Sequence, residues 1–138
     1  MILVDSSVLI DVIEEQDVRW ADWSETQITQ ARSRDVLCIN LLIYSEIARD
    51  FSAKANVDAF ISDLELQIDP LSPEIAFAAA TAHAGYRQSG GLRGATLPDL
   101  FIGAHAAVKG YPLLTRDAKR IRTYFPRVTL ITPDFSPE

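Results

Sequence analysis

The stretch Ile2-Leu3-Val4-Asp5-Ser6-Ser7-Val8-Leu9 contains the transition that decides the fold. Its apolar start is too short to form a helix, and it ends in Asp5 and two serines, which are residue types that favour the first position of a helix. Apolar residues then recur at helical spacing as far as Ile13. This pattern predicts a buried strand that leads directly into a helix.

The same alternation of short apolar runs and helical patterns continues along the chain. We expect strands over residues 2–4, 36–39, 68–71, 111–115 and 128–131. We expect helices over residues 8–13, 18–34, 41–51, 57–64, 74–88, 98–109 and 117–124, with a Gly-rich loop over 89–94. Strands that alternate with helices form a parallel sheet covered by helices, so an α/β fold is predicted. Ligands of such sheets bind at the carboxyl ends of the strands.

The length and composition are those of one globular domain, residues 1–138. The chain is 48% hydrophobic and 23% charged, which excludes a disordered polypeptide. No apolar stretch approaches the roughly 20 residues that a membrane-spanning helix needs, and the early Asp5 argues against a signal peptide. The single cysteine, Cys38, lies in an apolar run, so we expect a buried thiol and a cytoplasmic protein.

The net charge of −6 is unevenly distributed along the chain. Residues 1–75 carry 15 acidic and 5 basic residues, whereas residues 76–138 carry 4 acidic and 8 basic residues. An acidic chain is an unusual binder of nucleic acid, but the basic C-terminal part permits a phosphate-binding rim. A solvated helix face is the alternative explanation of the same basic residues.

Four acidic residues stand where an apolar segment meets the start or the inner face of a helix. Asp5 ends the first predicted strand, and Asp117 follows the fourth. In a parallel sheet these two positions lie at the same edge, although 112 residues separate them in the sequence. Asp99 opens the most apolar helix, where an unpaired charge would be unfavourable. Glu46 lies at the margin of the buried stripe of its helix, about 60° from Ile43.

Four converging carboxylates require a cation. Like charges at close range raise one another's pKa and oppose folding, and a divalent ion reverses that effect. Ligands that are all oxygen favour a hard ion such as Mg²⁺ or Mn²⁺. Such an ion lowers the pKa of a bound water and stabilises the oxygen that departs from phosphorus. The four acids therefore predict a metal-dependent nuclease.

Each acid also has a purely structural explanation. Asp5, Asp99 and Asp117 could cap helices or lie in a first turn, each contributing about 1 kcal/mol or less. Glu46 could form an ion pair with Arg49, one helical turn later. Composition and spacing alone leave both the structural and the metal-binding explanation open.

The segments that contain the four acids form a distinctive set. They are Leu3-Val4-Asp5-Ser6-Ser7-Val8-Leu9-Ile10-Asp11, Tyr44-Ser45-Glu46-Ile47, Leu97-Pro98-Asp99-Leu100-Phe101-Ile102-Gly103-Ala104 and Leu113-Leu114-Thr115-Arg116-Asp117. Together they resemble the PIN-domain ribonucleases, in particular the VapC-like toxins of toxin–antitoxin pairs. The segments occur in the order typical of that family, and the resemblance extends over essentially the whole chain. Many family members have Asn where this chain has Ser45.

The resemblance implies a three-layer α/β/α sandwich around a short, mainly parallel sheet. It implies Mg²⁺- or Mn²⁺-dependent cleavage of RNA by an enzyme that forms a homodimer or a higher even oligomer. It also implies a cognate antitoxin protein whose C-terminal segment lies across or near the active site. The residues that match the acidic metal ligands of the family are Asp5, Glu46, Asp99 and Asp117.

Further polar residues are expected to support this site or to contact the substrate. Ser6 and Thr115 match family positions that often support the metal ligands. Basic side chains are expected to position RNA phosphates without reading the sequence. The residues to which we assign these phosphate contacts are Arg93, Arg116, Lys119 and Arg120.

Other functions remain alternatives to a ribonuclease toxin. The same fold could act on DNA or in the processing of ribosomal or transfer RNA, or it could be a binding module without catalysis. A response-regulator receiver also has aspartates at strand ends, but it needs a second acid and a late lysine where this chain has Ser6 and Arg116. His83 and His105 lie in predicted helices, and we expect both to be structural.

Overall fold

The computed structural model describes residues 1–88 and 96–133. Its centre is a five-stranded sheet in the order β3-β2-β1-β4-β5, and every neighbouring pair of strands is parallel. The strands are β1 (Ile2–Val4), β2 (Leu37–Ile39), β3 (Gln67–Ile68), β4 (Leu113–Leu114) and β5 (Leu130–Ile131). Each of them overlaps a predicted strand. The sheet is thus parallel throughout, where a mainly parallel sheet was expected.

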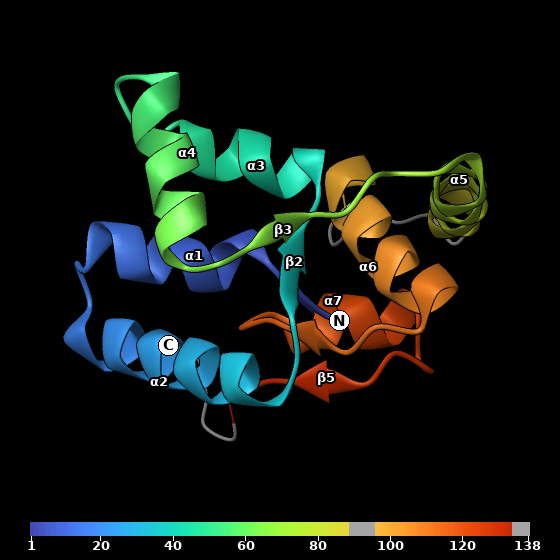
Figure 1. The fold of residues 1–138 in the computed structure, drawn as a ribbon. Coiled ribbons are helices and arrows are strands. Elements are labelled where there is room, and N and C mark those ends of the chain that lie inside the picture. Colours follow the sequence, from blue (N-terminus) through green and yellow to red (C-terminus); the bar gives the residue numbers. More distant parts are fainter. Residues whose placement is uncertain (89–95, 134–138) are drawn as a thin grey trace.

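Helices cover both faces of the sheet. They are α1 (Ser6–Glu14), α2 (Val18–Arg34), α3 (Leu41–Ala48), α4 (Lys54–Asp63), α5 (Pro73–Gln88), α6 (Leu97–Lys109) and α7 (Ala118–Tyr124). In Figure 1, α1, α2 and α4 lie to the left of the sheet, and α5, α6 and α7 lie to the right. The predicted three-layer α/β/α sandwich is therefore confirmed.

One predicted helix is shorter in the structure, and one predicted loop is not described. The helix predicted over 41–51 ends at Ala48, because the N–H groups of Asp50 and Phe51 bond to carbonyls only three residues back, which tightens the chain into turns. The predicted Gly-rich loop at 89–94 lies outside the described residues.

The order of the strands reverses at β1. From β1 the chain moves outward to β2 and β3, and it then returns to place β4 on the other side of β1. Right-handed crossovers in opposite directions put their helices on opposite faces of the sheet. The carboxyl ends of β1 and β4 consequently flank the reversal point, which is where parallel α/β sheets bind ligands.

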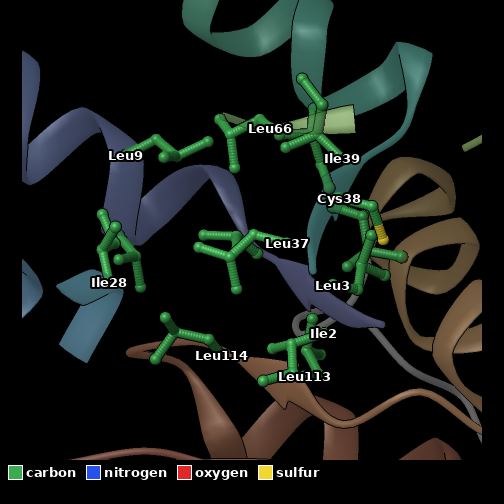
Figure 2. Close-up of a cluster of buried hydrophobic side chains, with 14 of the residues drawn as sticks. Ile2, Leu3, Leu9, Ile28, Leu37, Cys38, Ile39, Leu66, Leu113 and Leu114 are labelled. Atoms are coloured by element: carbon green, nitrogen blue, oxygen red, sulfur yellow. The ribbon is translucent and has the colours of Figure 1, made fainter. Parts of the chain in front are cut away.

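β1, β2 and β4 are apolar throughout because helices bury both faces of the sheet there, whereas both residues of the edge strand β3 are exposed. Figure 2 shows Leu37 and Leu114 on the side of α1 and α2, and Leu3 and Cys38 on the opposite side. All four side chains are at most 1% exposed. Burial raises the pKa of Cys38 to about 12, with a smaller contribution from the charge of Asp69. The thiol is therefore protonated at neutral pH, as expected for a buried, inert cysteine.

The helix α6 is held by a second apolar cluster and by a close approach to α7. Ile75 and Ala79 of α5 pack with Leu100 and Ala104 of α6. At Gly103, an added Cβ would lie 2.4 Å from the ring of Phe125, the residue that follows α7. Only glycine permits this contact. The helix α6, which contains Asp99, and the helix α7, which follows Asp117, therefore approach each other closely at Gly103.

Within the described residues, no helix is long and apolar enough to cross a membrane.

Candidate metal centre

Asp5 lies at the edge of the sheet between β1 and β4. Its main-chain N–H donates to the carbonyl of Leu114 at 2.9 Å. Its Oδ2 accepts hydrogen bonds from Thr115 Oγ1 at 2.7 Å and from Ser7 Oγ at 3.0 Å. Asp5 occupies the N-cap position of α1, but its side chain makes no capping hydrogen bond. The Asp5 carboxylate therefore does not cap α1; it is held by the hydroxyl of Thr115, which follows β4, and by that of Ser7 in the first turn of α1.

Glu46 is joined to Asp5 through Ser6. Ser6 Oγ donates to Glu46 Oε1 at 2.9 Å and lies 3.5 Å from Asp5 Oδ1. Arg49 Nε donates to the main-chain carbonyl of Glu46 at 3.2 Å, whereas the Glu46 carboxylate accepts from Ser6. The hydroxyl of the buried Ser6 thus links the start of α1 with the inner face of α3.

Asp99 both caps α6 and faces α7. Its Oδ2 accepts from Thr96 N at 3.1 Å, and Thr96 Oγ1 accepts from Asp99 N at 3.5 Å, which forms a capping box. The same Oδ2 accepts from Arg120 Nη1 at 3.0 Å. The predicted capping role of Asp99 is therefore confirmed. The same carboxylate also binds Arg120, so capping is not its only contact.

Asp117 precedes α7 and presents its carboxylate to the same arginine. Arg120 Nε lies 3.2 Å from Asp117 Oδ2. The main-chain N–H of Asp117 donates to Thr115 Oγ1 at 3.0 Å, and the Asp117 side chain makes no capping bond. Thr115 thus contacts two of the predicted ligands, as an acceptor for Asp117 and as a donor to Asp5.

Three of the four acids line one cavity of about 20 Å³. Asp5, Asp99 and Asp117 form its acidic wall. A volume of this order admits one water-sized occupant. Glu46 does not line the cavity and reaches the site only through Ser6. Among the residues that the structure describes, no three acidic, His or Cys side chains stand close enough to coordinate one metal ion.

The carboxylates affect one another electrostatically. Burial raises the pKa of Asp5, opposed by the hydrogen bonds from Thr115 and Ser7, and the charge of Asp99 raises it further. Burial also raises the pKa of Glu46, and the charges of Asp5 and Asp99 add to this effect. A cation near these groups would remove the repulsion. Carboxylate oxygens are the ligands that a hard divalent ion prefers, so the donor set fits such an ion. Arg120 already supplies one positive charge beside Asp99 and Asp117.

The predicted phosphate contacts differ in their surroundings. The guanidinium of Arg116 contacts Asp11 and lies 3.9 Å from the centroid of the Trp20 ring, and it is half-buried. Lys119 and Arg120 are exposed. Arg93 lies outside the described residues. Among the described residues predicted to contact phosphate, Lys119 and Arg120 therefore present their charge at the surface.

The roles of Ser7 and Asp11 were not predicted from the sequence. Ser7 Oγ donates to Asp5 and accepts from the main-chain N–H of Arg116 at 3.3 Å. Asp11 accepts from Ser24 Oγ at 2.8 Å and holds Arg116. The pair of serines directly after Asp5 could have indicated that Ser7 contacts this carboxylate. Nothing in the local pattern of α1 indicates that Asp11 pairs with the distant Arg116.

Comparisons with known proteins agree with this fold. The profile of the PIN domain family matches residues 2–126, so the chain belongs to the PIN domain family, whose members are nucleases. This assignment excludes the receiver alternative. No curated protein sequence matches the chain.

Several solved structures resemble the chain over nearly its full length. VapBC2 from Rickettsia felis, bound to a DNA fragment of its promoter, has 20% identity and a TM-score of 0.69, covering 97% of this chain and 100% of that one. VapBC-1 from nontypeable Haemophilus influenzae has 17% identity and a TM-score of 0.72, covering 96% and 98%. VapBC-5 from Mycobacterium tuberculosis has 18% identity and a TM-score of 0.57, covering 95% of each chain. At this identity the likeness establishes the fold.

Proposed function

We propose that this protein is a Mg²⁺- or Mn²⁺-dependent endoribonuclease that acts in the cytoplasm as the toxin of a toxin–antitoxin pair. The observation that carries the proposal is the convergence of Asp5, Asp99 and Asp117 on one small cavity at the reversal point of the sheet. Glu46 is joined to this group by the hydroxyl of Ser6. Membership of a nuclease family supports phosphodiester hydrolysis as the chemistry.

The four carboxylates are the proposed ligands of the ion. When bound, Mg²⁺ or Mn²⁺ lowers the pKa of water and stabilises negative charge on the departing oxygen. The hydroxyls of the chain orient the ligands: Thr115 and Ser7 donate to Oδ2 of Asp5, and Ser6 donates to Oε1 of Glu46. Such supporting hydrogen bonds fix ligand geometry and strengthen metal binding.

Lys119 and Arg120 are the proposed phosphate contacts among the described residues. Both are exposed on α7, beside the cavity that Arg120 itself lines. A phosphate contact by Arg116 would require its guanidinium to leave Asp11 and the Trp20 ring. Phosphate contacts of this type position a nucleic acid and make its binding depend on salt. Lys119→Gln should therefore weaken RNA binding and reduce its salt dependence.

A protein partner and self-association are part of the proposal. The relatives from Rickettsia felis and Haemophilus influenzae are described as VapBC, and the one from Mycobacterium tuberculosis as a member of a family of toxin–antitoxin systems. These descriptions support a cognate antitoxin for this chain. A homodimer or higher even oligomer is the second part of the proposal, and it rests on the resemblance to VapC-like toxins alone. Co-expression with the adjacent reading frame should restore growth if that frame encodes the antitoxin, and light scattering measures the oligomer.

Asp99→Asn tests the metal site without removing the cap of α6. The amide oxygen can still accept from the N–H of Thr96, while the charge is lost. We expect RNA cleavage to fall by more than about 100-fold and calorimetric Mn²⁺ binding to weaken strongly, because a ligand is lost. EDTA should stop cleavage by the wild-type protein.

Thr96→Ala is the matched control for Asp99→Asn. It removes the bond from Asp99 N–H to the Thr96 hydroxyl and the bond from that hydroxyl to Asp99 Oδ2 at 3.0 Å. It should cost about 1 kcal/mol of stability, yet it retains the Asp99 carboxylate and should retain most of the cleavage. If Asp99→Asn cleaved RNA as well as Thr96→Ala does, the metal assignment would be wrong. A wild-type protein that binds no Mn²⁺ would favour the non-catalytic binding module instead.

The nucleic-acid substrate needs a separate assay. Matched single-stranded RNA and DNA oligonucleotides, together with transfer and ribosomal RNA, are incubated with the same protein in Mn²⁺. Selective cleavage of RNA supports the proposed activity. Preferential cleavage of DNA would replace it with a DNA nuclease of the same fold.

A further inference from the structure

A buried polar network joins α3 to α6, the two helices that carry Glu46 and Asp99. His105 of α6 is 0% exposed, and its Nε2 lies 2.8 Å from Asp69 Oδ2. Its Nδ1 lies 3.1 Å from Nδ2 of Asn40, which is also 0% exposed. Asn40 follows β2 and is the N-cap of α3, and Asp69 follows β3. The network therefore connects two strand ends with α6.

One main-chain donor fixes the direction of the hydrogen bonds. Ile43 N–H donates to Asn40 Oδ1 at 3.0 Å, which caps α3. The amide nitrogen of Asn40 consequently faces His105 and must donate to Nδ1, because an amide nitrogen does not accept hydrogen bonds. His105 then carries its proton on Nε2 and donates to Asp69. Each polar atom of the network has a single role.

Tyr111 and Cys38, two titratable groups that are affected by the charge of Asp69, are neutral at neutral pH. The Tyr111 ring lies 6.0 Å from the His105 ring. The pKa of Tyr111 is raised, first by burial and then by the charge of Asp69. The buried Cys38 is protonated for the same two reasons. Asp69 is thus the one charged group that these contacts direct at His105.

A directional network constrains two helices more tightly than apolar contact does. Buried polar groups are unfavourable unless they are paired, so any shift that breaks one bond of the network is resisted. Glu46 lies six positions beyond Asn40 and Asp99 lies six positions before His105. Six helical residues correspond to a rise of about 9 Å. A displacement at the network is transmitted along each helix, because packed interiors transmit strain.

We propose that Asn40, His105 and Asp69 are positioning residues that set the separation of Glu46 and Asp99 and thereby the metal affinity of the acidic site. This inference rests on the proposed function, since it takes these two carboxylates as metal ligands. The three residues do not touch the ion. They act through α3 and α6, and the link that reaches α3 is the bond between Asn40 and His105.

Substitutions at position 105 separate the two bonds of the histidine. His105→Asn places an acceptor where Nδ1 stands and keeps the bond from Asn40, whereas His105→Gln keeps a donor toward Asp69 and loses Asn40. Mn²⁺ binding to the metal-free full chain is measured by calorimetry at a temperature where circular dichroism shows both variants folded. We expect His105→Asn to bind within about threefold of wild type, and His105→Gln to bind about tenfold more weakly.

Ile28→Ala is the control for lost stability. Ile28 is buried in α2, which carries none of the four acids, so this variant should unfold more easily and bind Mn²⁺ with unchanged affinity. If wild type binds Mn²⁺ and His105→Gln binds it equally well, the positioning role is overturned while the proposed function stands. If wild type binds no Mn²⁺, the proposed function fails and the positioning role fails with it.

Nitrogen-15 NMR of the imidazole gives a readout that needs no metal. Wild-type His105 should be the neutral Nε2–H tautomer. Asn40→Asp retains an acceptor for Ile43 N–H but replaces the amide donor that faces Nδ1 with an acceptor, so the preference of His105 for the Nε2–H tautomer should be lost. An Nδ1–H tautomer in the wild-type protein would contradict the bond directions and overturn the network.

Discussion

The guanidinium of Arg120 lies 3.0 Å from Oδ2 of Asp99. It also lies 3.2 Å from Oδ2 of Asp117, so one side chain neutralises two of the carboxylates that we propose as metal ligands. An ion at this site must share these oxygens with Arg120 or displace it. Arg120 is therefore both a counter-ion of the metal-free site and a competitor of the metal.

Arg120→Gln should tighten Mn²⁺ binding by about fivefold. Two partly exposed ion pairs contribute about 0.5 kcal/mol each, and their sum corresponds to about that factor. RNA cleavage at saturating Mn²⁺ should nevertheless fall, because the variant loses a proposed phosphate contact. Calorimetry and a cleavage assay measure the two effects. Arg122→Gln, an exposed position on the same helix, should change neither, and weaker Mn²⁺ binding by Arg120→Gln would contradict the competition.

Asp5→Asn should change how stability depends on pH in the absence of metal. The pKa of Asp5 is raised above its usual 3.8 in the folded protein, mainly by burial. A raised carboxyl pKa stabilises the fold fully below the unfolded value, and this contribution is lost as pH rises through the folded pKa. Between about pH 4 and pH 7 the difference in unfolding free energy, Asp5→Asn minus wild type, should therefore increase.

Urea denaturation in EDTA at several pH values measures this difference. Asp22→Asn is the control, because Asp22 is exposed on α2 and its variant should show no trend. Excess Mn²⁺ should stabilise the wild-type protein more than Asp5→Asn, since only a protein that binds the ion is stabilised by it. If the difference in unfolding free energy between Asp5→Asn and wild type fell with rising pH, burial would not be the main influence on the pKa of Asp5.

Gly103→Ala should destabilise the protein by about 1–3 kcal/mol, the usual cost of overpacking. The added methyl group would lie 2.4 Å from the ring of Phe125, so either the ring or α6 must move. Gly85→Ala is the matched control in another helix, where an added Cβ meets nothing within 4 Å. That variant should stabilise α5 by roughly 0.5–1 kcal/mol. Equal effects of both variants in urea unfolding would refute the close approach.

Arg116→Gln should lower stability by about 1–3 kcal/mol, because it leaves the carboxylate of Asp11 without its cation. It should also change the fluorescence of Trp20, whose ring faces the guanidinium at 3.9 Å. Arg127→Gln replaces an exposed arginine and should be neutral. If Arg116→Gln weakened RNA binding but left the free energy of unfolding unchanged, Arg116 would be a phosphate contact and not a structural link.

The fold was predictable because its signals are local. The central strands β1, β2 and β4 are short apolar runs, since helices bury both faces there, and each is followed by a helical pattern. The placement of Asp5 and Asp117 at one sheet edge follows from parallel topology alone. The structure does bring Asp5, Asp99 and Asp117 to one cavity, whereas the role of all four acids as metal ligands stays a prediction.

The remaining features depend on pairings that no local spacing records. Arg116 and Asp11 are 105 positions apart, and either residue alone looks like an ordinary surface charge. His105 was expected to be structural, but its partner Asp69 lies 36 positions away, and only the packing of α6 against the end of β3 brings them together. Sequence spacing predicts on which face of its helix or strand a side chain lies. Tertiary packing determines which residues it contacts there.

The position of β4 has a consequence for the time at which the protein matures. β1 lies in the middle of the sheet, yet β4, one of its two neighbours, is made more than 100 residues after it. Thr115 donates to Asp5 across 110 positions, so a nascent chain that is still short of residue 115 cannot hold this carboxylate in place. The acidic site is therefore assembled only after the chain has been synthesised through Asp117, and a chain that stops before this residue has no complete site.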